Sequence, residues 1–223
     1  MGPLLAIDTS SRQASLALFE GPRGRIDLIG WWSLQASALG REVAPRVVDL
    51  LKTHQLRAAD LAAVAVALGP GSFTGLRAGM SLAKGFSLAG GIPLLGIPTA
   101  DAVAHMQEPI DLPLWAILDA GRGRICVSGY RHQQGQWRRA SEYRLTTWPA
   151  LWGELRGPAL VCGELSTEGF EPPAGAGDGL TLRPSGPRAA AIAALAWERY
   201  TRGEVDDPIA LEPFYLPTPA MGA

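Results

Sequence analysis

The chain has 223 residues, which is long enough for a substantial core in one large or two small domains. Hydrophobic residues make up 47% and charged residues 18%, as in a soluble globular protein, and a formal net charge of −1 argues against an overall basic, nucleic-acid-binding surface. The N-terminus lacks the pattern of a signal peptide. Arg77 and Lys84 interrupt the most apolar stretch, so we expect no membrane span.

The numbers and positions of the cysteines and histidines bear on the cellular compartment and on metal binding. Cys126 and Cys162 are the only cysteines, which favours buried thiols in a reducing compartment and leaves one disulfide open. We therefore predict a cytoplasmic protein. The three histidines have no metal-ligand spacing, so we predict no metal site.

The first hundred residues alternate between strand and helix patterns. Short apolar or alternating runs predict three antiparallel strands near 4–7, 14–19 and 26–34. Helical spacing of apolar residues predicts a helix over 39–51, with Pro45 near its start or at a kink. We then expect a strand over 61–68, a helix over 73–90, a strand over 93–97 and a helix over 99–106.

The second half begins with an echo of the first. Leu114–Asp119 resembles Leu4–Asp8, and the alternating run 125–130 matches 14–19. The match is short enough to arise by chance; taken at face value, it predicts two related halves, each opening with a strand–Asp–turn–strand hairpin. Strands near 136–143 and 159–162, helices over 149–155 and 188–202, and an irregular segment over 163–187 complete an α/β fold. We expect 211–216 to dock and the chain beyond 217 to be disordered.

The sequence is organised around Gly-Pro-Gly-Ser-Phe-Thr-Gly-Leu-Arg at 69–77. It predicts a strand, a glycine-rich turn and a helix capped by Ser72. Such a helix N-terminus suits phosphate, but the glycine spacing fits neither a P-loop nor a dinucleotide fingerprint. Two interpretations of this loop therefore remain: a phosphate-binding site, or a sharp turn that lets the helix pack closely on a sheet.

Two aspartates end predicted strands at turns. Asp8 and Asp119 could serve magnesium and phosphate, or could accept hydrogen bonds from turn N–H groups. Together with Gly71, they are the candidates for a nucleotide site.

The helix after the glycine loop carries a face with little side chain. Gly75, Gly79 and Ala83 share this face, beside a ridge that includes Phe73, Leu76 and Met80. Such a helix can be approached closely by another helix. The contact could lie inside the monomer or between molecules, together with the helix over 39–51.

At these residues the chain resembles the TsaB (YeaZ) family. Residues 69–77, Leu-Ala-Ile-Asp-Thr at 5–9, the strand region 91–97 and Glu-Pro-Phe-Tyr-Leu at 212–216 carry the resemblance. It implies an actin-like (ASKHA, ribonuclease-H-like) fold of two related lobes. We assign the lobes to 1–108 and 109–223, with the tail packing back. Leu39 and Gly121 stand where the family commonly has His and Arg, so roles of those side chains are not carried over.

The resemblance also implies a role in forming threonylcarbamoyladenosine in tRNA. It implies a non-catalytic partner of the transferase TsaD, with TsaE as a third component, a homodimer when alone, and contact with tRNA through the complex. TsaD binds its metal through a His-x-x-x-His motif that would fall on Thr99 and Val103 here. Neither residue can ligate as histidine does.

The family pairs through its N-terminal lobe, so the resemblance implies an interface on the two helices of that lobe. We carry it onto seven residues: Leu39, Val43, Val47, Phe73, Leu76, Arg77 and Met80. The sequence indicates no firm cofactor, although weak nucleotide binding stays open. The alternative function is a stand-alone actin-like ATPase or kinase that uses Asp8, Asp119 and the glycine loop.

Overall fold

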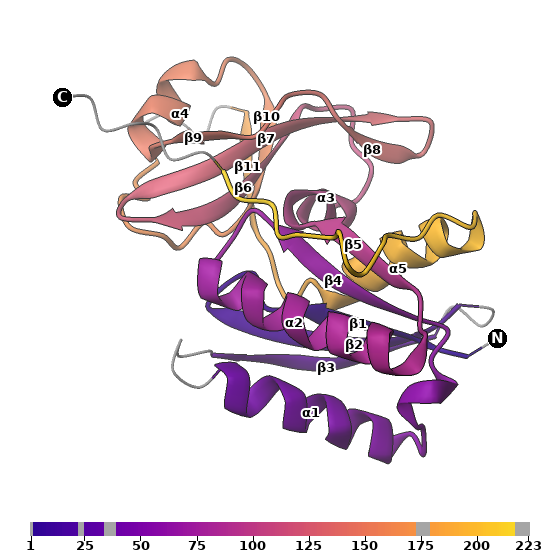
Figure 1. Ribbon diagram of the computed structural model, residues 1–223. Helices are drawn as coiled ribbons and strands as arrows, with labels where there is room; N and C mark the ends of the chain where they lie inside the picture. Colours follow the sequence, from indigo (N-terminus) through magenta and orange to yellow (C-terminus); the bar gives the residue numbers. More distant parts are fainter. Residues whose placement is uncertain (1, 22–24, 34–38, 173–178, 217–223) are drawn as a thin grey trace.

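The computed structural model describes residues 2–21, 25–33, 39–172 and 179–216. It contains two β-sheets, one above the other, with helix α3 between them (Figure 1). The first sheet has the order β3-β2-β1-β4-β5. Its strands are β1 (Leu4–Asp8), β2 (Gln13–Glu20), β3 (Arg25–Ser33), β4 (Ala63–Gly69) and β5 (Leu94–Pro98).

The second sheet repeats this arrangement. Its order is β11-β10-β6-β7-β8, with β9 also pairing with β7. In both sheets an antiparallel hairpin is followed by parallel strands, so β6 corresponds to β1. The predicted α/β fold of two related, actin-like lobes is confirmed. The strands are β6 (Leu114–Gly121), β7 (Arg124–Gln133), β8 (Gln136–Arg139), β9 (Arg144–Thr146), β10 (Ala159–Gly163) and β11 (Leu180–Pro184).

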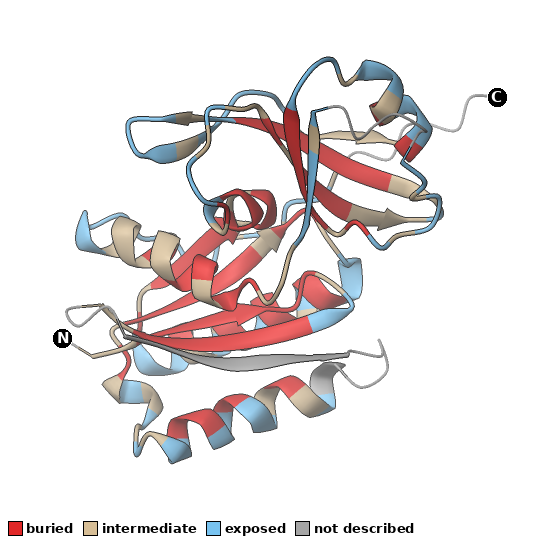
Figure 2. Cartoon of the chain, turned by 180° about the vertical axis from the view of Figure 1, so that it is seen from behind, coloured by how far each residue is buried: buried red, intermediate tan, exposed pale blue. Residues whose placement is uncertain are grey.

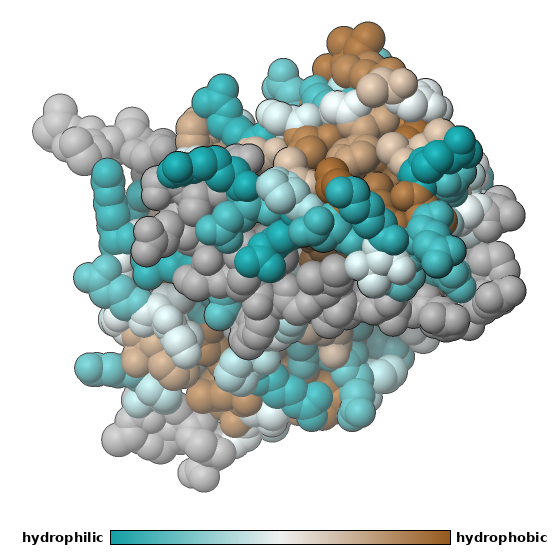
Figure 3. Space-filling view, turned by 90° about the horizontal axis from the view of Figure 1, so that it is seen from below, coloured by the Kyte–Doolittle hydropathy of each residue, from teal (hydrophilic) through white to brown (hydrophobic). Residues whose placement is uncertain are grey.

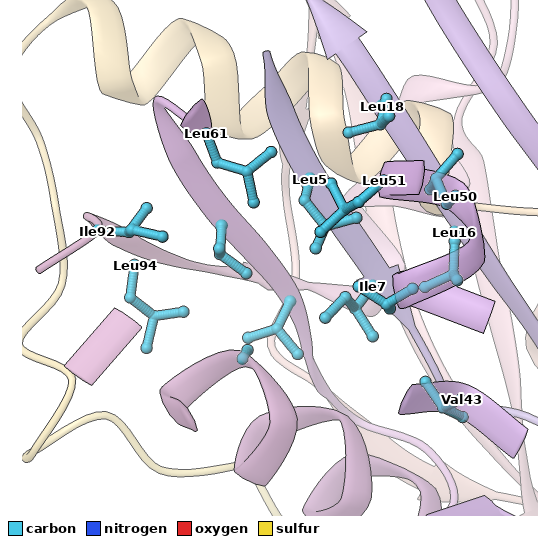
Figure 4. Close-up of a cluster of buried hydrophobic side chains, with 14 of the residues drawn as sticks. Leu5, Ile7, Leu16, Leu18, Val43, Leu50, Leu51, Leu61, Ile92 and Leu94 are labelled. Atoms are coloured by element: carbon cyan, nitrogen blue, oxygen red, sulfur yellow. The ribbon is translucent and has the colours of Figure 1, made fainter. Parts of the chain in front are cut away.

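Side chains alternate across the first sheet, so each face has its own core. Leu5, Ile7 and their neighbours face helices α1 (Leu39–Thr53) and α2 (Phe73–Gly90), as Figure 4 shows. Leu4, Ala6 and the other residues of the opposite face pack mainly on α5 (Ala189–Thr201). Strands β1, β2, β4 and β5 are buried along most of their length (Figure 2).

Helix α3 (Thr99–His105) joins the two lobes. Val103 and Ala104 belong to the core on one face of the second sheet, whereas Ala102 belongs to the α5 core of the first sheet. On the other face of the second sheet lies α4 (Trp148–Glu154), and a short 3-10 helix, η2 (Ala58–Asp60), precedes β4. None of the helices among the described residues is long and apolar enough to cross a membrane.

The end of the chain returns to the first sheet. Helix α5 packs on β1 and β2, and the backbone N–H of Phe214 donates to the carbonyl of Leu68 (2.7 Å). Asp206 forms a backbone bridge with Leu94 in β5. The division into lobes at 108/109 stays a prediction. The last helix of the second segment lies on the sheet of the first, and residues 217–223 lie outside the described part.

The second half differs from the prediction in two strands. The segment 163–187, expected to be irregular, contains β11, which pairs in parallel with β10. Its apolar and polar residues alternate over only four positions, Leu180 to Arg183, and its side chains are largely exposed, so the pattern is too short to distinguish a strand from a loop. The strand expected near 136–143 ends at Arg139, and a separate strand, β9, begins at Arg144.

The two cysteines are free and buried, on β7 and β10. Burial raises the pKa of both thiols to about 12, so the reactive thiolate is scarce at neutral pH. We expect Ellman's reagent to modify neither thiol in the native protein and both in guanidinium chloride. Rapid modification of the native protein would contradict this prediction.

Candidate functional site

The glycine loop lies against the end of β1. The backbone N–H of Ser72 donates to the carbonyl of Ser10 (2.6 Å), and a Cβ added at Gly71 would lie 2.2 Å from that oxygen. Only glycine permits this approach. Ser72 caps α2 as predicted, because its side chain accepts from the N–H of Gly75 (3.3 Å). The loop and the end of β1 therefore form one rigid unit.

Asp8, at the end of β1, is held by a buried arginine. The Nε of Arg188, immediately before α5, donates to Asp8 Oδ2 (2.8 Å), and its second amino group donates to Ser10 Oγ (3.1 Å). The N–H and hydroxyl of Ser10 both donate to Asp8 Oδ1 (2.9 and 2.5 Å). Both oxygens of the carboxylate are thus occupied by groups of this chain.

Arg188 also binds the second lobe. Its first amino group donates to Glu164 Oε1 (2.7 Å), and Glu164 Oε2 accepts from the N–H of Asp119 (2.7 Å). Burial disfavours the charge of Arg188, but the carboxylates of Asp8 and Glu164 outweigh that cost and raise its pKa. The three side chains form an inter-lobe ion-pair network.

The space beside this network is small. The cavity lined by Asp8, Gln13, Glu164 and Arg188 has a volume of ≈ 30 Å³, room for about two water molecules. The structure therefore brings Asp8 and the Asp119 end of β6 to one network, with Gly71 against Ser10, and leaves only this small cavity beside them. No His, Cys, Asp and Glu cluster in the described ranges could hold a metal.

The small-residue face of α2, formed by Gly75, Gly79 and Ala83, lies inside the monomer. A Cβ at Gly75 would lie 1.9 Å from the carbonyl oxygen of Thr9, and one at Gly79 would lie 2.3 Å from Thr9 Oγ1. The Thr9 hydroxyl donates to the carbonyl of Gly75 (2.7 Å). The hypothesis that this face receives a partner is wrong, because Thr9 already fills it.

Four of the seven predicted interface side chains also need correcting. Val43, Val47, Leu76 and Met80 are at most 3% exposed and belong to the cores of the first lobe. Helical apolar spacing marks a covered face but does not tell whether a sheet or a partner covers it. The side chain of Leu39 lies outside the described part, whereas Phe73 and Arg77 are exposed.

A different face of α2 is open to solvent. It is an exposed stripe of five residues: Phe73, Arg77, Ser81, Gly85 and Leu88. Its ends are apolar, with Phe73 57% and Leu88 58% exposed, and its middle is small, with nothing within 4 Å of a Cβ at Gly85. On the α1 side of the molecule, hydrophobic side chains lie in separate groups among hydrophilic ones (Figure 3).

Aromatic residues of the tail extend this stripe. The rings of Phe73 and Tyr215 lie 5.1 Å apart, and the guanidinium of Arg77 lies 5.0 Å from the Phe73 centroid. Val48 on α1 is a further exposed apolar residue, at 43%. The α2 stripe and Tyr215 thus form a mixed apolar and basic surface.

Sequence reasoning missed Arg188 and Glu164. Each lies in a segment of Gly, Pro and polar residues, and their partners are distant in sequence. The one signal was the position of Arg188 at the start of a strongly predicted helix.

Comparison with known proteins gives consistent matches. The sequence model of the family described as "TsaD: tRNA N6-adenosine threonylcarbamoyltransferase" matches residues 35–161, more than half of the chain. The tRNA threonylcarbamoyladenosine biosynthesis protein TsaB of Escherichia coli is 31% identical over 60% of this chain and 58% of that protein. TsaB of Bacillus subtilis is 30% identical over 59% of this chain, and the match spans only 56% of that relative's length.

Two further matches cover nearly the whole chain. An uncharacterized protein of Mycobacterium bovis is 32% identical over 97% of this chain and 92% of that protein. The structure of YeaZ from Pseudomonas aeruginosa superimposes with a TM-score of 0.77 at 25% identity, covering 97% of this chain and 100% of that chain.

Proposed function

The chain belongs to the TsaB (YeaZ) family, and from this premise we propose that it acts in the biosynthesis of threonylcarbamoyladenosine in tRNA. Its role in the proposal is that of a non-catalytic, cytoplasmic scaffold. It binds and supports the transferase TsaD together with TsaE, and it forms a homodimer when alone. It meets tRNA through the complex rather than directly.

The observation that carries the non-catalytic role is the inter-lobe ion-pair network. In an actin-like ATPase the cleft between the lobes must admit phosphate and a cation. Here Arg188 forms ion pairs with both Asp8 and Glu164, and the cavity that remains beside them has a volume of ≈ 30 Å³. A buried, fully paired network of this kind suits a fixed arrangement of the lobes.

The positions equivalent to the metal-binding histidines of TsaD support the same proposal. Thr99 and Val103 are both fully buried on α3, and Val103 packs in the core of the second lobe. A metal ligand in either place would have to replace a packed core residue. The family's metal chemistry therefore belongs to the partner in this proposal.

The exposed α2 stripe is the proposed partner contact. Helices can approach most closely where small residues interrupt the side-chain ridges, as Ser81 and Gly85 do here. Phe73 and Leu88 supply apolar contacts at the two ends, and Arg77 supplies a charge. This assignment keeps Phe73 and Arg77 and replaces the four buried side chains, which lie on α1 and α2, with exposed residues of α2.

Ser81→Arg is expected to weaken binding to TsaD, and self-association, by at least about tenfold, because a close helix contact cannot take in a hydrated guanidinium. Sedimentation velocity measures self-association, and co-purification with TsaD and TsaE measures complex formation. Ser166→Arg, at an exposed position of the second lobe, is the matched control. If a folded Ser81→Arg variant binds as tightly as the unmodified chain, the exposed α2 stripe is not part of the interface.

The functional test is tRNA modification by TsaD and TsaE with and without this chain. We expect modification to depend on the chain and to survive Asp8→Asn in proportion to the folded fraction. The alternative, a stand-alone ATPase or kinase, predicts ATP hydrolysis by the isolated chain that Asp8→Asn abolishes.

A further inference from the structure

A second, much larger cavity lies away from the ion-pair network. It has a volume of ≈ 410 Å³, within the range of small-molecule sites, and is formed where α3, α5 and the β7–β8 hairpin meet. These elements come from both lobes, and in Figure 1 β8 lies above α5. Its lining is Ile97, Pro98, Asp101, His105, Tyr130, Gln136, Trp137, Arg138, Arg139, Leu195, Glu198, Arg199 and Arg202.

One part of the lining is apolar and the floor is polar. Ile97, Leu195 and the half-buried indole of Trp137 supply flat or apolar surface. On the floor, the hydroxyl of Tyr130 donates to Asp101 Oδ1 (2.5 Å), and burial raises the pKa of Asp101. Tyr130 and Asp101 are therefore already paired with each other, and a ligand must be recognised by the other lining residues.

The rim is rich in arginine. Four arginines line the cavity against two carboxylates. Arg199 and Arg202 pair with Asp206 and Glu204, which lie outside the lining. Arg139 stacks on the ring of Tyr143 (4.6 Å to the centroid) rather than pairing directly with a carboxylate.

Arg138 is exposed on β8, and no carboxylate of the described ranges lies within ion-pair distance of it. Arg138 and Arg139 both belong to the lining of this partly apolar cavity, and a guanidinium group is a strong ligand for phosphate or carboxylate. The mouth is otherwise crossed by one hydrogen bond, from Gln136 Nε2 to Glu198 Oε2 (3.2 Å), which joins the hairpin to α5.

We propose that this cavity binds a small organic anion, with a phosphate or carboxylate at Arg138 and Arg139 and a planar or apolar body against Trp137 and Leu195. The site is separate from the inter-lobe network and from the α2 stripe. Binding here needs neither the transferase nor tRNA, so the outcome of its test is independent of the proposed function.

The probe is phenyl phosphate, titrated into the full chain while the Trp137 indole N–H resonance is followed by NMR. This N–H donates to the carbonyl of Gln107 (3.0 Å), and its signal is assigned by its loss in Trp137→Phe. We expect a saturable shift at millimolar concentration, and weaker binding of inorganic phosphate and of phenol, each of which carries one half of the recognised chemistry.

Variants that change the charge of the lining test whether the cavity prefers an anion. Arg138→Gln is expected to weaken phenyl phosphate binding about threefold, and Asp101→Asn to tighten it, because the amide still accepts from Tyr130 and removes a nearby negative charge. Arg156→Gln, on an exposed loop of the second lobe, is the control. The proposal is overturned by no Trp137 shift up to about 10 mM probe, by equal binding of phenol, or by unchanged affinity in Arg138→Gln.

Discussion

Arg188→Met is expected to lower the free energy of unfolding by about 3–5 kcal/mol, the usual effect of removing one partner from a buried ion pair. Arg188 is 3% exposed, and methionine keeps much of its volume but leaves Asp8 buried without a cation. The loss should appear as a lower urea midpoint, measured by circular dichroism and tryptophan fluorescence.

A double-variant comparison separates the network from simple packing. Asp8→Asn in the Arg188→Met background removes the unpaired carboxylate and should restore part of the lost stability. Two independent side chains would instead give additive losses, which would show that the inter-lobe ion-pair network does not act as a unit. The Glu164 side chain is 19% exposed, against 2% for Asp8, so Glu164 should contribute less to stability than Asp8.

Gly75→Ala and Gly85→Ala, on one helix, are expected to change stability in opposite directions. At Gly75 the new Cβ meets the backbone oxygen of Thr9 at 1.9 Å, so β1 and α2 must move apart, at a cost of about 3 kcal/mol or more. At Gly85 nothing lies within 4 Å, and alanine should stabilise the helix by up to about 1 kcal/mol.

Thermal unfolding of the two alanine variants beside the unmodified chain measures this difference. Because both variants make the same chemical change in α2, the contrast between them mainly reports the close packing at Gly75, where Thr9 is the nearest neighbour. Equal transition temperatures for the two variants would mean that α2 does not pack on β1 as described.

Much of the first lobe follows from its sequence because local patterns there coincide with tertiary contacts. Ser72 caps α2 as its type predicts, and the alternating run 14–19 forms a strand as predicted, although β2 is buried on both faces. The echo of Leu4–Asp8 in Leu114–Asp119 predicted two related halves that each open with a hairpin, and both sheets contain that hairpin. The exposed edge strand β11 was not predicted, because its alternation is only four residues long and lies in a segment rich in Gly and Pro.

The site was harder to predict, because its contacts join distant segments. Asp8 and Arg188 are 180 residues apart, and no local spacing relates them. For α2 the sequence identified the small-residue face correctly but not what covers it. Thr9, an unremarkable residue after a strand, decides that question by its contacts with Gly75 and Gly79.

The return of α5 to the first sheet has a consequence for synthesis on the ribosome. One face of that sheet, with Leu4, Ala6 and Ala65, is covered by residues 189–196, near the end of the chain. While the second lobe is being translated, this apolar face lacks the helix that provides most of its cover. The first lobe therefore completes its fold only after α5 emerges, and until then the nascent chain presents a surface of the kind that chaperones bind.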